Sequence, residues 1–379
     1  MKDLSDLQSY NRVLVDITAL AYNYRLLSSL MPEGIELLAM VKGDGYGHGM
    51  IESAKAFAKA GCVTFGVAEL REGVLLREAG IEGAIFVMVG FIPDQVSHYF
   101  TSCLTPVVFS SEAIELLAQT ALERDTTIDI HLKVDCGMSR LGVQPSEVGR
   151  FARLIESLPG VHLAGVVSHF PESDNVKSES TNKAYRTFET ACQAIGGQVH
   201  VLNHIANSGA VLNFPETICD MGRAGIALYG YPPSTDPEDA VVGNKRLRPV
   251  MSFTTRVVMV KTVAAGTGIS YGHTFVTERE TKLAVLPVGY EDGYPRCLSN
   301  RGEVLIKGKR ASILGRVCMN LCMVDITEID GVEVGDEAVL LGSQGQETIT
   351  ADDIAGWAGT ISYELLCMLG NNNQRVYTE

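Results

Sequence analysis

Short apolar runs alternate with amphipathic segments between about residue 36 and residue 230. Each run is rich in valine, isoleucine or leucine, and its apolar positions are continuous, which is typical of strands buried on both faces of a parallel sheet. Helical spacing lies between the runs, for example over 50–60 and 111–122, and also over 18–30 before the first run. The strands are expected to end near Lys42, Ala68, Gly90, Phe109, Asp135, His169, His204 and Cys219.

Eight strand–helix units in roughly 200 residues predict a TIM barrel, (β/α)8, and therefore the α/β class. The pattern changes after a stretch rich in proline and aspartate, 231–239, which is typical of a linker. Beyond it, apolar strands such as 252–263 and 282–288 are separated by glycine turns. These strands predict a second, mostly β domain.

The expected domain boundaries follow from this change of pattern. The barrel is assigned to 1–240 and the mostly β C-terminal domain to 245–379. One N-terminal strand, 12–16, precedes the barrel pattern and can pair with the second domain. Thr350 is expected to begin a short helix in that domain.

The composition is that of an ordinary globular protein, with 379 residues, 46% hydrophobic and 20% charged. The formal net charge of -14 argues against nucleic acid or an anionic membrane as a partner. The N-terminus lacks the apolar segment of a secretory signal, and no apolar run reaches the length of a membrane span. A cytoplasmic protein is therefore expected. The 9 cysteines are scattered and odd in number, so we expect neither a disulfide framework nor a zinc site.

The segment 36–49 runs from an apolar strand directly into Lys42 and then into a glycine-dense turn that carries Tyr46. A lysine at the end of a buried strand is poorly solvated, which lowers the pKa of its ammonium group and lets the amine attack a carbonyl. The glycines allow the backbone to approach a ligand closely. A dinucleotide fingerprint is the alternative, but His48 stands where its third glycine would fall. A purely structural glycine turn also stays open on this segment alone.

Polar side chains follow several of the expected strands, at the end where a TIM barrel has its active site. Arg223 lies in an apolar setting, where an unpaired guanidinium is costly, so it requires a partner. Taken singly, Arg140 could be a surface arginine, His169 a core histidine and Ser208 a helix cap. The loops after strands 7 and 8 commonly bind phosphate in this fold. The residues are Lys42, Lys133, Asp135, Arg140, His169, His204, Asn207, Ser208, Arg223, Gly225 and Ile226.

Longer motifs carry these residues. They read Lys42-Gly-Asp-Gly-Tyr-Gly, Lys133-Val-Asp-Cys-Gly-Met-Ser-Arg-Leu-Gly, Asn203-His-Ile-Ala-Asn-Ser and Met221-Gly-Arg-Ala-Gly-Ile. Three more lie in the expected second domain: Gly268-Ile-Ser-Tyr-Gly, Leu286-Pro-Val-Gly-Tyr and Leu314-Gly-Arg-Val-Cys-Met. Together they resemble the motifs of the alanine racemase family over nearly the whole chain. That family binds pyridoxal 5'-phosphate (PLP) on the lysine of the first motif.

The resemblance implies a role for each matching residue. The catalytic bases would be Lys42 and Tyr271, and the substrate would be bound by Arg140 and Met319. PLP would be held by Lys42, Tyr46, His169, Asn207, Ser208, Arg223, Gly225, Ile226 and Tyr377. Supporting or access-corridor positions would be Lys133, which can carry a carbamate, and Asp174, Tyr290, Arg296 and Arg316. No metal is implied.

The implied reaction is the PLP-dependent interconversion of L- and D-alanine, which supplies D-alanine for bacterial peptidoglycan. Lys42 would serve one face of the α-carbon and Tyr271 of the partner subunit the other. The resemblance therefore also implies a homodimer whose active site is shared across the interface. It further implies a hydrogen-bond chain from Arg223 through His169 to the tyrosine, with Arg223 facing the pyridine nitrogen of PLP.

Some positions depart from the family pattern. Gly43-Asp-Gly replaces the commoner Ala-Asn-Ala, Glu291 stands where alanine is usual, and Asn320 follows Met319 where aspartate is usual. Asn320 removes a negative charge near the substrate, which keeps open a serine-type or broad-specificity amino-acid racemase. A barrel-type PLP-dependent amino-acid decarboxylase is a further alternative, and it predicts a cysteine acid in place of Tyr271. A PLP-binding regulatory protein, in turn, would lack the second domain.

Overall fold

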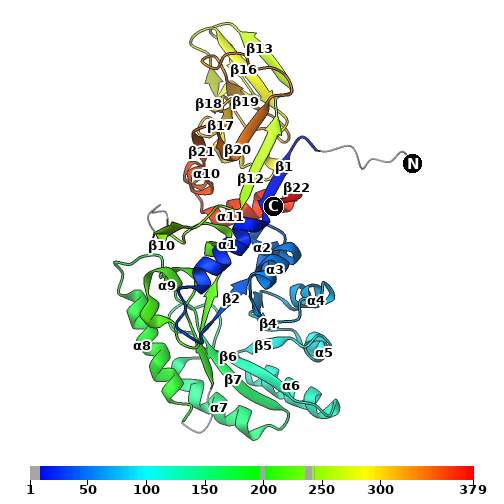
Figure 1. The fold of residues 1–379 in the computed structure, drawn as a ribbon, viewed down its shortest axis with the longest axis vertical. Helices are drawn as coiled ribbons and strands as arrows, with labels where there is room; N and C mark the ends of the chain where they lie inside the picture. Colours follow the sequence, from blue (N-terminus) through cyan, green and yellow to red (C-terminus); the bar gives the residue numbers. More distant parts are fainter. Residues whose placement is uncertain (1–8, 197–200, 235–240, 243) are drawn as a thin grey trace, which may run out of the picture. The chain divides into compact units, whose positions relative to one another are not determined.

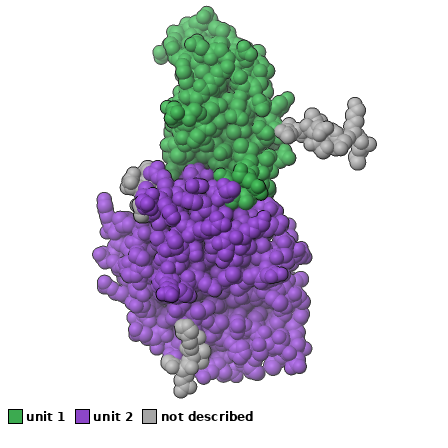
Figure 2. Space-filling model, in the orientation of Figure 1, with its two compact units in different colours: residues 1–17, 46–49, 250–379 green, residues 18–45, 50–249 purple. Residues whose placement is uncertain are grey.

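The computed structural model describes residues 9–196, 201–234, 241–242 and 244–379. These residues cluster into two compact units, which Figure 2 shows in different colours. Unit 1 consists of 1–17, 46–49 and 250–379, and unit 2 consists of 18–45 and 50–249. Each unit has its own sheets and its own buried apolar core.

Unit 2 is built on a parallel sheet that has eight strands within the described residues, in the order β8-β7-β6-β5-β4-β3-β2-β9. Helices follow most of the strands and lie outside them (Figure 1). The predicted (β/α)8 architecture is confirmed. The strands are β2 Glu36–Met40, β3 Thr64–Val67, β4 Ala84–Val87, β5 Thr105–Val108, β6 Ile128–Lys133, β7 Val161–Val167, β8 Leu202–His204 and β9 Met221–Ala224.

Over the described residues, β8 and β9 are the two edge strands of this sheet and do not pair along a ladder, so the barrel is nearly but not fully closed. Two backbone hydrogen bonds bridge them instead. The Asp220 amide donates to the Asn203 carbonyl at 2.9 Å, and the Arg223 amide donates to the Ala206 carbonyl at 2.9 Å. These bonds satisfy part of the exposed edges and bring the loops after β8 and β9 together.

The helices of unit 2 agree with the helical spacing of the sequence to within a few residues. Ser110 caps α6, since its side chain accepts a hydrogen bond from the Ala113 amide at 3.2 Å. The helices are α1 Ile17–Ser28, α3 Met50–Lys59, α4 Leu70–Glu78, α5 Val96–Thr101, α6 Ser111–Glu123, α7 Val148–Ser157, α8 Ser180–Gln193 and α9 Ser208–Asn213. The 3-10 turns are η1 Pro93–Gln95, η2 Pro145–Glu147, η3 Pro215–Thr217 and η4 Ile226–Tyr229.

The position expected for the last barrel strand was wrong. A strand ending near Cys219 was predicted, but that apolar run belongs to η3 and its exit, and β9 begins at Met221. Pro215 starts η3 because its fixed φ suits a helical turn. Gly222 weakens the strand pattern of this segment, since glycine has low strand propensity. Arg223 therefore lies within β9, not after it.

Unit 1 is mostly β. Over its described residues it contains a seven-stranded sheet with the path β18-β17-β20-β12-β1-β22 and with β21 beside β20. The N-terminal β1 pairs antiparallel with β12 and parallel with β22. This sheet consists of β1 Arg12–Asp16, β12 Met251–Arg256, β17 Glu303–Ile306, β18 Lys309–Ser312, β20 Glu337–Gln344, β21 Glu347–Ile349 and β22 Gln374–Thr378.

Smaller elements complete unit 1. A second sheet has the order β13-β16-β19, and β14 pairs with β15. Thr350 caps α10, since its side chain accepts from the Asp353 amide at 3.0 Å. These elements are β13 Met259–Val263, β14 Gly268–Ile269, β15 Phe275–Val276, β16 Thr281–Leu286, β19 Cys322–Asp325, η6 Tyr271–His273, η7 Tyr290–Asp292, η8 Arg296–Leu298, α10 Ala351–Ala358 and α11 Ser362–Asn372.

The single strand predicted over 252–263 is two strands, β12 and β13, that belong to different sheets. Two consecutive residues between β12 and β13 donate their backbone hydrogen bonds to different segments of the chain. The Val257 amide donates to the Asp336 carbonyl at 2.9 Å, and the Val258 amide donates to the Val285 carbonyl at 3.0 Å. The sequence does not reveal this change of sheet, because both halves are rich in residues with strand propensity, although β12 is mostly buried and β13 mostly exposed.

The segment predicted as a linker, 231–239, falls partly on 235–240, which lie outside the described residues. After it, the short hairpin β10 Val241–Val242 and β11 Lys245–Arg246 lies in unit 2. The exact boundary between the domains stays a prediction.

Candidate active site

Lys42 lies two residues beyond β2, where the chain makes a left-handed turn. Gly43, Asp44 and Gly45 have φ angles of 63°, 51° and 64°, so the segment α2 Lys42–Tyr46 is not a right-handed helix. The Gly45 amide closes the turn by donating to the Val41 carbonyl at 2.8 Å. Left-handed backbone is costly for residues with a Cβ, which explains the two glycines. Lys42 itself is half-buried at the start of this turn.

Arg223 is buried, and its guanidinium makes three hydrogen bonds within the described residues. It donates from Nη1 to Nδ1 of His204 at 3.0 Å, and from Nη2 to the carbonyls of Ser168 at 2.6 Å and Ile205 at 3.2 Å. Burial lowers the pKa of Arg223 to about 10, so the guanidinium is still protonated at neutral pH. The requirement for a partner, inferred from the sequence, is met by β7 and β8.

The arginine also orients two buried histidines. Because a guanidinium only donates, His204 must accept at Nδ1 and carry its proton on Nε2. That proton points at Nδ1 of His131, 2.9 Å away. Burial, and after it the charge of Arg223, lowers the pKa of both histidines, so both stay neutral. Sequence reasoning missed His131; Gly165 makes room for it, since a Cβ there would lie 2.2 Å from its ring.

The expected hydrogen bond between Arg223 and His169 is not present in the described part of the chain. His204 takes that position, and Nε2 of His169 lies 3.4 Å from Nδ2 of Asn207 instead. The physical reason is register: His204 is the last residue of β8, which faces β9 directly, whereas His169 lies beyond the end of β7. The structure therefore corrects this part of the implied network.

Four cationic side chains lie within electrostatic range of His169. Burial lowers the pKa of His169 well below its ordinary value, and the charges of Arg223, Lys133, Arg140 and Lys42 lower it further. The pKa of Lys133 falls to about 7, first through burial and then through the nearby arginines. Arg223 within β9 and residues at or beyond the ends of β2, β6 and β7 thus lie near one another. Such a concentration of positive charge favours an anionic ligand.

Asn207 and Ser208 connect the loops after β8 and β9. Asn207, not Ser208, caps α9, because its Oδ1 accepts from the Ala210 amide at 3.2 Å. Ser208 Oγ accepts from the Gly225 amide at 2.8 Å, at the start of η4 and beside Ile226. These are the two loops at which a TIM barrel commonly binds phosphate.

The loop that carries Arg140 is held by Asp135. Its Oδ1 accepts hydrogen bonds from the amides of Gly137 and Ser139, each at 3.0 Å. Burial alone would raise the pKa of Asp135, but these backbone bonds bring it below its ordinary value. Arg140 itself is exposed at the end of this loop, and Asp174 is exposed in the loop after β7.

Unit 1 gathers the candidate residues of the second domain around two short turns. Tyr271 begins η6 and is 72% exposed. The preceding Ser270 donates from its hydroxyl to the Arg316 carbonyl at 2.7 Å, which joins the two motifs. Arg296 lies exposed in η8.

Tyr290 and Met319 are held together by backbone hydrogen bonds. The Tyr290 amide donates to the Cys318 carbonyl and the Glu291 amide to the Met319 carbonyl, both at 3.1 Å. Gly289 permits this approach, since a Cβ there would lie 2.3 Å from the Met319 carbonyl oxygen. The two departures from the family pattern also meet here, because Nδ2 of Asn320 donates to the Glu291 carboxylate.

Tyr46 and Tyr377 lie in unit 1 as well. The Tyr46 ring lies 6.2 Å from that of Tyr363, and burial raises the Tyr46 pKa well above its ordinary value. Gly49 is needed beside Tyr377, because a Cβ there would lie 2.0 Å from the tyrosine hydroxyl.

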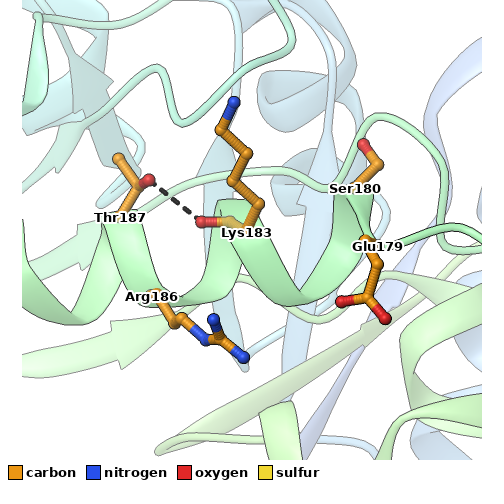
Figure 3. A pocket seen from close by; sticks show the side chains of 5 residues that line it. All are labelled: Glu179, Ser180, Lys183, Arg186 and Thr187. Carbon is orange, nitrogen blue, oxygen red and sulfur yellow. Dashed lines mark hydrogen bonds between the residues drawn. The ribbon is translucent and has the colours of Figure 1, made fainter.

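A shallow hollow along α8 is lined by Glu179, Ser180, Lys183, Arg186 and Thr187 (Figure 3). The Thr187 hydroxyl donates to the Lys183 carbonyl at 2.9 Å, an ordinary bond within a helix. None of the candidate residues lines it. Over the described residues, no group of three or more His, Cys, Asp or Glu side chains could hold a metal, and no helix is long and apolar enough to cross a membrane.

A parallel barrel with a lysine just beyond its first strand, and with cationic side chains gathered near the strand ends, has the architecture of a barrel enzyme whose active site suits an anionic ligand. Two family models match the chain: "Alanine racemase, N-terminal domain" over 15–233 and "Alanine racemase, C-terminal domain" over 250–377. The chain belongs to the alanine racemase family.

Relatives match over almost their full length. The alanine racemase of Halothermothrix orenii is 40% identical over 365 residues, which cover 96% of this chain and 95% of that protein. The solved alanine racemase from E. faecalis is 34% identical with a TM-score of 0.90, covering 98% of this chain and 99% of that one. A structure from Bartonella henselae with covalently bound pyridoxal phosphate is 27% identical with a TM-score of 0.88, covering 98% and 100%.

Proposed function

We propose that Lys42 and Tyr271 are the two bases of the alanine racemase activity that its family gives this chain. The enzyme is an isomerase of L- and D-alanine, and its cofactor is PLP. The observation that carries the role of Lys42 is its place directly beyond β2, within electrostatic range of His169 and the other cations. The role of Tyr271 rests on its motif, Gly268-Ile-Ser-Tyr-Gly.

The residues at the barrel end fit PLP. Both Nη atoms of Arg223 donate hydrogen bonds, but within the described residues its Nε does not, which leaves a donor for an aromatic ring nitrogen. Gly225 and Ser208 lie in the two loops suited to phosphate. We propose that PLP is held by Lys42, Tyr46, His169, Asn207, Ser208, Arg223, Gly225, Ile226 and Tyr377. When bound, PLP supplies the electron delocalisation that acidifies the α-hydrogen of an amino acid.

The protein's own residues would then position the substrate and move one proton. Arg140 would bind the substrate carboxylate, because a planar guanidinium matches it with two parallel hydrogen bonds. Lys42 would accept the α-proton on one face and Tyr271 would deliver one on the other face, or the reverse. Arg223 would remain protonated beside the ring nitrogen, since its pKa is about 10. Met319, Lys133, Asp174, Tyr290, Arg296 and Arg316 would shape the substrate site and its access corridor.

We further propose a homodimer in which Tyr271 and Met319 come from the partner subunit. Support comes from three aromatic or apolar side chains of unit 1 that are unusually exposed: Tyr271 at 72%, Met319 at 54% and Tyr290 at 42%. A cytoplasmic location and supply of D-alanine to peptidoglycan stay predictions of the sequence.

A serine-type or broad-specificity racemase remains the second candidate because of Asn320. One observation weighs against it. The Asn320 amide binds the Glu291 carboxylate, so a negative charge is restored beside the position where the family aspartate is usual. Assays of both enantiomers of alanine, serine and other small amino acids would decide between the two. A decarboxylase would instead release carbon dioxide from one of them.

The central test of the proposal uses Tyr271→Phe, which keeps the ring and removes the hydroxyl. The variant should retain PLP and lose racemisation in both directions, because each turnover needs both bases. Exchange of the α-hydrogen with solvent should persist for one enantiomer only, the one whose proton faces Lys42. Equal residual exchange from both enantiomers would point to a single base. Borohydride reduction and peptide mapping should place the pyridoxyl label on Lys42, and a label elsewhere would exclude its role.

A further inference from the structure

One carboxylate outside the site described above is bonded to the backbone next to Lys42. Glu72 lies in the first turn of α4, the helix that follows β3. Its Oε1 accepts a hydrogen bond from the Gly43 amide at 2.8 Å. Its Oε2 accepts from the amides of Ala68 at 2.7 Å and Glu69 at 3.2 Å. A single side chain thus satisfies three backbone donors at the ends of two barrel strands.

Part of this arrangement is ordinary helix capping. The bond from the Glu69 amide to Glu72 is half of a capping box, which many helices have. Glu147 makes the same bond with the Gln144 amide at 3.3 Å and, in the described part of the chain, bonds only within its own turn and helix, for example to Arg150 at 2.8 Å. Capping does not explain the bond to Gly43, which is 29 residues away in the sequence and belongs to another strand.

The Gly43 bond lies at the most constrained point of the backbone. Five successive residues after Lys42, from Gly43 to Gly47, have positive φ, and two of them, Asp44 and Tyr46, have a Cβ. A left-handed conformation at a residue with a Cβ persists only where several surrounding contacts hold it in place. Three bonds do so here: Gly45 to the Val41 carbonyl at 2.8 Å, the Met50 amide to Asp44 at 2.8 Å, and Gly43 to Glu72 at 2.8 Å. Of these three, the Glu72 bond ties the turn to a neighbouring strand–helix unit.

We propose that Glu72 is a positioning residue for Lys42. Its carboxylate fixes the peptide that follows the lysine and couples the ends of β2 and β3, so the lysine side chain leaves the strand in one direction. The inference rests on the proposed role of Lys42 and deepens it. Lys42 would have to face one side of the substrate α-carbon, so a fixed backbone at the lysine should increase the reaction rate. Small displacements of reacting groups lower the rate by large factors.

The test compares three variants of the full-length chain. Glu72→Gln replaces one acceptor oxygen with a donor that opposes the amides, and Glu72→Asp keeps the charge but shortens the reach toward Gly43. Glu147→Gln is the matched control, since it alters a capping-box glutamate with no bond to another strand. Hydrogen–deuterium exchange of peptides covering 41–46 reads the turn directly, with and without PLP. The dissociation constant of PLP and kcat are measured on the same samples.

Both Glu72 variants should exchange the Gly43 amide at least about 10-fold faster, because a hydrogen bond to a charged group contributes ~1.5–3 kcal/mol. Their PLP affinity and kcat should fall by a similar factor, while KM for alanine changes little. Glu147→Gln should match the wild type in all three. Unchanged exchange in both Glu72 variants, or an equal change in Glu147→Gln, would overturn the proposal. The borohydride label on Lys42 is a separate result, so failure of the proposed function would be recognised independently.

Discussion

At the residue scale, the turn after Lys42 shows how backbone conformation selects amino acids. Gly43 has a φ of +63°, yet an added Cβ would meet nothing within 4 Å. Gly47 has a φ of +85°, and a Cβ there would lie 2.2 Å from the Leu366 carbonyl oxygen. Gly43 is therefore required only by its backbone conformation. Gly47 is required both by its conformation and by the close packing of the Leu366 carbonyl against it.

An alanine substitution should destabilise the protein to a different extent at each of these two glycines. Gly43→Ala should lower the free energy of unfolding by about 1 kcal/mol, the price of left-handed backbone for an alanine. Gly47→Ala should cost about 3 kcal/mol or more, or prevent folding, because overpacking is added to that strain. Urea unfolding of both variants measures the difference. Similar costs at the two positions would contradict the packing argument.

Lys133 provides a prediction about pH. Its pKa is lowered to about 7 by burial and by the neighbouring arginines, so the amine becomes neutral as pH rises through that value. Only the neutral amine adds to carbon dioxide, forming a carbamate and releasing one proton. The 13C NMR spectrum of protein in labelled bicarbonate should therefore show a carbamate signal that grows as pH rises through about 7. Lys133→Gln is the control, and a signal that persists in it would exclude this lysine.

At the scale of elements, two loops of unit 1 differ from the family pattern in which of them carries a negative charge. The family pattern, with alanine and aspartate, is replaced by Glu291 and Asn320, whose side chains are hydrogen-bonded. The loops themselves are held by the amides of Tyr290 and Glu291. The two departures therefore form one compensated change and not two independent ones.

This coupling predicts the result of restoring one position at a time. Asn320→Asp should raise KM for alanine by about 5-fold, since two carboxylates at hydrogen-bond distance repel by about 1 kcal/mol even in water. Adding Glu291→Ala to Asn320→Asp should remove most of that effect. Steady-state kinetics of the two single variants and the double variant give the coupling energy. Additive effects would show that the positions act separately.

At the scale of the whole molecule, the proposed shared site predicts complementation between inactive variants. Lys42→Ala lacks one base and Tyr271→Phe lacks the other, so each homodimer should be inactive. After the two are unfolded and refolded together, half of the symmetric dimers should be mixed and carry one intact site of two, restoring about a quarter of wild-type activity. The same variants mixed without exchange of subunits serve as the control. No recovery after exchange would contradict a site shared across the interface.

Much of the fold could be predicted because it depends on local pattern. Buried parallel strands leave continuous apolar runs, and helices leave a 3.6-residue period, so seven of the eight barrel strands were placed near their true ends. Lys42 and Arg223 could be singled out for a related reason. A charged group next to a buried strand needs a ligand or a partner, and that need is visible in the sequence alone.

The tertiary structure decided which residues form hydrogen bonds with one another. His204 instead of His169 binds Arg223 because β8 faces β9, and Glu72 reaches Gly43 because β2 and β3 are neighbours in the sheet. A capping glutamate looks the same in sequence whether or not a second strand lies within its reach. Likewise, β12 and β13 follow one another as a single stretch of strand-forming residues, and strand pairing assigns them to different sheets. The sequence pattern determines which residues must be buried or must have a hydrogen-bond partner. Strand order and register determine which residues those partners are.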